Sequence, residues 1–222
     1  MAEIARSILY VHIFFGMLAL FIAPAAMITH KGGLWHRRWG KVYFWAMAVV
    51  AVSAILLSVL RPQLFLPMVA VFSFYLAFTG YRVLYRKSPQ HSASTLDWIG
   101  AGLMLLGGAG LLWYGIFLVR TSSFGIVAIA FGSVGLLLAI SDVQAFRHPS
   151  SDKRAWWFTH IRRMLAAYIA TVTAFSAVNF QFLPPVARWL WPSVAGTLGI
   201  FAWVRYYRKK FYGTKMRSKV VK

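Results

Sequence analysis

The sequence predicts an all-α fold, a bundle of seven transmembrane helices with the N-terminus outside the cell and the C-terminus in the cytosol. Sixty per cent of the residues are hydrophobic and 13% are charged, a balance far from that of a soluble domain. Apolar runs of 18 or more residues recur along the chain. Such runs can cross about 30 Å of hydrocarbon as helices, and they are too long for barrel strands of roughly ten residues.

The chain contains no cysteine. Disulfides, thiolate metal sites, iron–sulfur clusters and covalently attached c-type haem are therefore excluded.

The first apolar segment resembles a signal peptide. "IAPAA" looks like a small-residue cleavage site, but the preceding apolar core of about 19 residues is longer than the usual 7 to 15, so a retained helix is expected. "RPQ" is a tight turn between the next two segments. The predicted spans cover residues 7–29, 41–60, 64–81, 97–119, 122–142, 156–182 and 186–204.

The fourth and fifth segments are rich in glycine, which predicts close helix packing in lipid. Tryptophans and tyrosines gather near the predicted span ends, as is typical of aromatic belts at the headgroup level. No internal repeat is visible, and the short connections predict one transmembrane domain, residues 1–204, followed by a basic tail, residues 205–222.

The positive charges alternate between connections. Twenty lysines and arginines fall in the first, third and fifth connections, at the adjoining span ends and in the tail, against four on the other side: Arg6, Arg61, Arg120 and Arg188. By the positive-inside rule this asymmetry predicts the orientation stated above. The tail is expected to rest on anionic lipids of the bilayer rather than to bind nucleic acid.

Asp142 is one of only four acidic residues, and it ends the fifth predicted span. Ala128 and Gly135 precede it at intervals of seven residues, so the carboxylate continues a small-residue stripe that should face another helix. The predicted cytosolic layer also holds the following basic side chains: His36, Arg37, His148, His160 and Arg163.

Three interpretations of this layer stay open. Asp142 can pair with Arg163 or Arg37 and hold spans five, six and two together. His36, Asp142 and His160 can instead form a site for a divalent metal such as zinc, iron or manganese. The arginines and histidines can also receive an anionic headgroup or a quinone, with Arg37 and Arg163 as ligand-binding residues.

His12 lies about a turn inside the outer end of the first predicted span. A hydrogen bond, with Asn179 near the outer end of span six as partner, is favoured over a ligand role. A b-type haem needs two axial histidines at matching depth, and the pair His30 and His160 could hold one at the cytosolic side. A retinal protein is excluded, because the seventh predicted span lacks lysine.

Four short motifs carry a resemblance to a family. "H-x-x-x-G" at His12, "HRRWGKVY" at His36, the aspartate that ends span five and "HIRRM" at His160 resemble an uncharacterised family of predicted bacterial inner-membrane proteins, a domain of unknown function distantly similar to b561 cytochromes. The resemblance extends to about Asn179. It implies about seven helices, location in the cell inner membrane and a polar site built from His12, His36, Arg37, Asp142, His160 and Arg163, without an agreed activity.

The sequence therefore predicts a multi-pass inner-membrane protein with a cytosolic-side His/Asp/Arg site for a metal or for an anionic lipid-like or quinone ligand. Alternatives from other classes are a membrane enzyme that uses a His/Asp-bound metal, a one-haem b-type electron carrier and a structural subunit of a larger bioenergetic complex with membrane-protein partners. No nucleophile stands out, since Ser141 has only its position beside Asp142.

Overall fold

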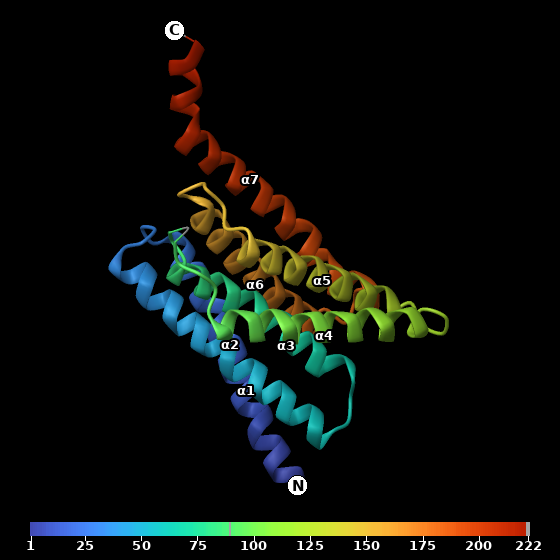
Figure 1. Cartoon of the computed structure of the whole chain (residues 1–222). Helices are drawn as coiled ribbons and strands as arrows, with labels where there is room; N and C mark the ends of the chain where they lie inside the picture. Colours follow the sequence, from blue (N-terminus) through green and yellow to red (C-terminus); the bar gives the residue numbers. More distant parts are fainter. Residues whose placement is uncertain (89, 221–222) are drawn as a thin grey trace.

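The computed structural model describes residues 1–88 and 90–220, which form helices and connections without a β-strand (Figure 1). The elements are α1 (Ala2–Ile28), α2 (Leu34–Leu60), α3 (Phe65–Arg82), the short 3₁₀ helix η1 (Val83–Tyr85), α4 (Thr95–Leu118), α5 (Gly125–Arg147), α6 (Ala155–Asn179) and α7 (Pro185–Val220). The predicted all-α class is confirmed.

Six of these helices, α1 to α6, are long and apolar enough to cross a membrane. Large apolar side chains on their outer faces are exposed, among them Phe14, Val52, Leu106 and Leu137. Outward apolar surface of this extent requires a lipid environment, and the protein is a multi-pass membrane protein. α7 is not one of the six, because Arg188 and several tryptophans lower the hydropathy of its apolar stretch.

The connections alternate between the ends of the bundle (Figure 1). The connections α1–α2, η1–α4 and α5–α6 gather at one end, here called the basic end, whereas the N-terminus and the α2–α3 turn lie at the other. Lys31, Lys87 and Lys153 belong to the three connections of the basic end. The segments that the charge pattern assigns to one side thus share one end of the molecule.

α3 occupies the centre of the bundle and packs against α2, α4 and α6, with a smaller contact to α5. α1 packs on α2, and α7 packs on α6. The closest pairing joins α4 and α5, as the glycines of both helices predict. At Gly132 a Cβ atom would lie 2.5 Å from the backbone nitrogen of Leu112, so only glycine permits this approach.

α7 continues well past residue 204, where the predicted span ends, and leaves the bundle at the basic end (Figure 1). Its extension contacts the α5–α6 connection: Arg154 Nη1 donates to the Phe211 carbonyl over 2.9 Å, and the Tyr212 hydroxyl donates to Asp152. The tail cations predicted to rest on anionic lipid include Lys215, Arg217, Lys219 and Lys222, whose side chains lie outside the described part of the structure.

Candidate functional site

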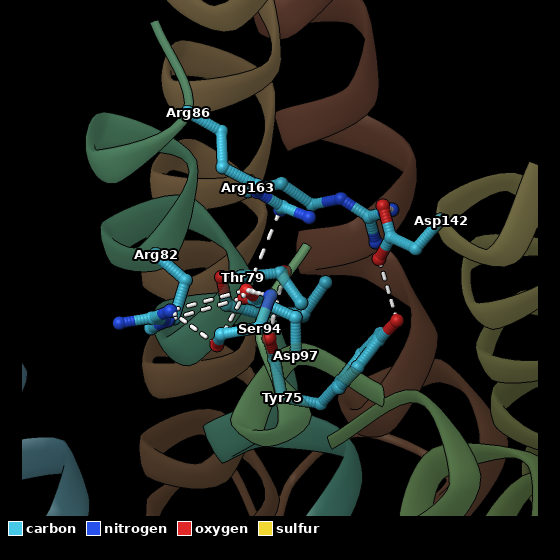
Figure 2. Close-up of polar contacts among 9 residues, drawn as sticks. Tyr75, Thr79, Arg82, Arg86, Ser94, Asp97, Asp142 and Arg163 are labelled. Carbon is cyan, nitrogen blue, oxygen red and sulfur yellow. Dashed lines mark hydrogen bonds and ion pairs between the residues drawn. The ribbon is translucent and has the colours of Figure 1, made fainter. Parts of the chain in front are cut away.

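Asp142 faces the interior of the bundle near the basic end, and it is 6% exposed. Its Oδ1 lies 2.8 Å from Nη2 of Arg163 on α6, and its Oδ2 accepts a 2.5 Å hydrogen bond from the hydroxyl of Tyr75 on α3 (Figure 2). Arg163, 5% exposed, also donates to the Leu138 carbonyl one turn before Asp142. These three residues, Tyr75, Asp142 and Arg163, are called the Asp142 cluster.

The predicted ion pair between Asp142 and Arg163 is confirmed. The expected third helix was wrong: the cluster joins α5 and α6 to α3 through Tyr75, and not to α2. The reason is the central position of α3, which packs against α6 and also contacts α5, whereas the backbone of α2 approaches neither of these two helices as closely. Arg37, the other predicted partner, is exposed and lies instead at a cavity described below.

The structure gives no support to a metal site made from His36, Asp142 and His160. Both carboxylate oxygens of Asp142 are engaged, by Arg163 and by Tyr75, so this aspartate is not available as a third ligand beside the two histidines. Among residues 1–88 and 90–220, no three histidine, aspartate or glutamate side chains are placed to hold one metal ion.

A second buried aspartate, Asp97, lies in the first turn of α4 beside the end of α3 (Figure 2). It forms a capping box with Ser94, and it receives Nε and Nη2 of Arg82, each over 3.1 Å. Nη2 of a second arginine, Arg86, lies 3.9 Å from Oδ1 of Asp97. A forked arginine–carboxylate pair is directional, so it fixes how α3 meets α4 across the intervening loop.

A cavity of about 460 Å³ opens among α1, α2, η1, α6 and α7 at the basic end. It is called the basic-end cavity. Its described lining contains no aspartate or glutamate. The polar and aromatic lining residues are Lys31, His36, Arg37, Lys41, Tyr43, Tyr81, Tyr85, Lys87, Trp156, Trp157, His160 and Trp203.

Four cations, Lys31, Arg37, Lys41 and Lys87, therefore share this cavity, and within the described residues none of them has a carboxylate partner. Lys31 Nζ lies 5.5 Å from the ring centre of Trp203 and also donates to the Met27 carbonyl. Lys87 lies 5.0 Å from the ring centre of Trp156. Partial burial lowers the pKa of Lys31, because the charged form loses water there.

His36 on α2 and His160 on α6 face each other at this cavity, with ring centres 6.2 Å apart. His36 Nδ1 lies 2.9 Å from the Ala26 carbonyl, and His160 Nδ1 lies 2.7 Å from the Gly80 carbonyl. Gly80 allows the second contact, since a Cβ atom there would lie 2.8 Å from Met164 Sδ on α6.

The remaining predicted residues lie elsewhere. His12 bonds Ser53 over 2.9 Å and the Val50 carbonyl over 3.2 Å, both on α2, so the expected bond with Asn179 was wrong. Asn179 is exposed at the end of α6 and donates to the Phe175 carbonyl. The α1–α2 pairing brings α2, not the end of α6, next to His12. His30 is exposed in its loop and is not part of the cavity lining, so His36, not His30, faces His160.

Sequence reasoning missed Tyr75 and Asp97. The S-x-x-D spacing of Ser94 and Asp97 is a capping signature that could have identified the second. Tyr75 carries no such signal, because its partner is 67 residues away in the chain.

No family model matches the chain, and no curated protein or solved structure shows significant similarity to it.

Proposed function

We propose that this multi-pass membrane protein binds one anionic amphiphile in the basic-end cavity. The observation that carries the proposal is the lining of the cavity, which combines tryptophan, tyrosine and aliphatic side chains with four cations. In the part of the chain that the structure describes, none of the four has a carboxylate partner. A ligand with an acidic group and an apolar body would satisfy both halves of this lining. Its acidic group would meet the lysines, and its apolar body would lie against residues such as Met27, Ile161 and Leu165.

We propose further that α7 crosses the membrane with the other six helices, with the N-terminus outside and the basic end at the cytosolic face of the cell inner membrane. The twenty-to-four distribution of lysine and arginine supports this orientation. Cytosolic leaflets carry anionic lipids, so a basic cavity at that face is positioned to receive an amphiphile laterally from the bilayer.

Native mass spectrometry of the purified protein tests the proposal with two probes that share acyl chains, phosphatidylglycerol and phosphatidylcholine. We expect tighter retention of the anionic lipid. We also expect the double variant Lys31→Gln/Lys87→Gln to bind the anionic lipid more weakly. Each lysine near an anionic headgroup contributes about 1 kcal/mol to binding, which corresponds to about a fivefold loss of affinity per lysine removed.

The double variant Arg61→Gln/Arg120→Gln is the matched control, because it removes the same number of charges at connections remote from the basic end. It should retain both lipids as the wild type does. Equal retention of the two lipids by wild-type protein that carries no other co-purified ligand, or equal loss in the two double variants, would contradict the proposal.

A further inference from the structure

His36 and His160 allow the ligand of the basic-end cavity to be specified. We infer that these two histidines would hold one b-type haem between α2 and α6, each through its Nε2. The inference rests on the proposed function and narrows it, since haem is an amphiphile with a flat apolar ring and two carboxylates.

The hydrogen bonds of the two histidines fix which ring nitrogen is free. A carbonyl oxygen can only accept, so Nδ1 of His36 and Nδ1 of His160 each carry a proton. Each Nε2 then has a lone pair, and within the described residues neither Nε2 has a hydrogen-bond partner. An imidazole held by its other N–H on a backbone carbonyl is the usual arrangement of a metal-ligating histidine.

The separation of the rings fits one ion between them. A metal lies about 2 Å from the coordinating nitrogen, and that nitrogen lies about 1 Å from its ring centre, so two imidazoles on opposite sides of one ion have ring centres about 6 Å apart. The observed separation of His36 and His160 is 6.2 Å, with the ring planes 78° apart. Edge-to-face ring pairs also have this spacing, so the distance permits an ion between the rings and the free Nε2 atoms argue for it. At a tetrahedral ion the same rings would be about 5 Å apart.

The number of ligands also favours haem over a bare metal ion. Zinc and non-haem iron sites use three or more protein ligands, and no third histidine, aspartate or glutamate joins this pair in residues 1–88 and 90–220. In haem the porphyrin supplies four nitrogens, and the protein needs to supply only the axial ligands. Two facing histidines are a complete set for that purpose.

The cavity provides room and counter-charges for the rest of the haem. Its volume of about 460 Å³ is in the range of small-molecule sites. Gly40 lies one turn after His36 on α2, and a Cβ atom there would meet nothing within 4 Å, which leaves open space beside the histidine. Three cations line the same cavity: Lys31 in the α1–α2 connection, Arg37 in the first turn of α2 and Lys87 in the η1–α4 connection. They could pair with the two propionates of the haem.

The remaining histidine of the bundle, His12, does not form a second site of this kind. It lies fourteen residues before Ala26, about 21 Å along α1, and its described partners are Ser53 and the Val50 carbonyl. The structure therefore points to a single haem at the basic end.

Absorption spectroscopy of the full-length protein tests the inference. The protein would be purified in detergent from cells supplied with a haem precursor, and the purified protein would also be titrated with haemin. We expect one haem per chain, with a Soret band and, after reduction with dithionite, the sharp α-band of six-coordinate low-spin iron. His36→Ala and His160→Ala should each lose this spectrum, and His12→Ala should keep it.

Two further measurements separate ligand loss from misfolding. Added imidazole should restore the low-spin spectrum of His160→Gly, since it can replace the missing side chain, whereas failure of a folded variant to recover would overturn the assignment. A wild-type protein that shows no Soret band after haemin titration would also overturn it, as would equal loss of haem in His12→Ala. If that protein still retains phosphatidylglycerol through Lys31 and Lys87, the haem assignment alone is wrong; if it retains neither ligand, the proposed function is wrong as well.

Discussion

Arg163 Nη2 lies 2.8 Å from Asp142 Oδ1, and this ion pair joins α6 to α5 at a point that excludes most water. The carboxylate is compensated on both oxygens, by the guanidinium and by the Tyr75 hydroxyl. A charged residue inside a membrane bundle requires such partners. The position of one of the chain's four acidic residues in the last two turns of α5, which continues to Arg147, thus has a structural explanation.

Asp142→Asn should destabilise the protein strongly. Asparagine keeps the shape of the side chain but leaves the buried Arg163 without a counter-charge, which costs about 3–5 kcal/mol. Thermal unfolding in detergent would measure the loss. Glu3→Gln, which neutralises an exposed acidic residue on α1, is the control and should change stability by no more than about 0.5 kcal/mol. Equal effects of the two substitutions would show that the ion pair contributes nothing.

Tyr75→Phe should cost less than Asp142→Asn, about 1.5–3 kcal/mol, because it removes one hydrogen bond to a charged group and leaves the ion pair in place. The same unfolding assay applies. The effects should also be non-additive: in the double variant Tyr75→Phe/Asp142→Asn the tyrosine substitution should cost little more, since its acceptor has already lost its charge. Full additivity would speak against a shared cluster.

Gly132→Ala should loosen the α4–α5 pair. The new Cβ atom would lie 2.5 Å from the Leu112 nitrogen and 2.8 Å from the Gly108 carbonyl, and these backbone atoms cannot turn away as a side chain can. Gly102→Ala, on α4, is the matched control because its Cβ atom would meet nothing within 4 Å. We expect that variant to be neutral or slightly stabilising, since alanine favours helix. The melting temperatures of the two variants test the prediction. A Gly132→Ala protein as stable as Gly102→Ala would show that the close approach of α4 and α5 at Gly132 is not required.

The proposed orientation can be tested with reporters. A periplasmic phosphatase fused after Arg120, in the α4–α5 connection, should be active, and a fluorescent protein fused at the C-terminus should fluoresce in the cytosol. Phosphatase activity from a C-terminal fusion would be incompatible with the orientation and with a cytosolic basic-end cavity.

Much of the fold follows from composition and periodicity, because the length of an apolar run is set by the thickness of the bilayer. The small-residue stripe before Asp142 predicted that this residue faces the interior of the bundle, and the structure confirms it. Arg163 was one of its two predicted partners. The part played by α3 could not be predicted. It depends on which helix occupies the centre of the bundle, and nothing local to Tyr75 indicates that neighbour.

The candidate site was predicted as one layer, but the structure divides it into two. Charge alternation placed His36, Arg37, Asp142 and His160 at one depth, and depth alone cannot tell which of them face the same space. Met164 and Arg163 follow His160 by four and three residues on α6, yet Met164 lines the cavity with His160 while Arg163 turns to Asp142. Such small rotations about a helix axis are set by packing, here against Gly80 of α3.

The most direct test of the basic-end cavity as a ligand site is photo-crosslinking from inside it, in the native membrane. Benzoylphenylalanine would replace Trp203, which lines the cavity beside Lys31, and in a parallel protein it would replace Phe201, which is 69% exposed on the outer face of α7. Mass spectrometry of the adducts should find an anionic amphiphile strongly enriched at position 203 over position 201, with the enrichment reduced by Lys31→Gln. Adducts of the same composition at both positions would contradict the account, because the cavity would then hold only the lipid that surrounds the whole protein.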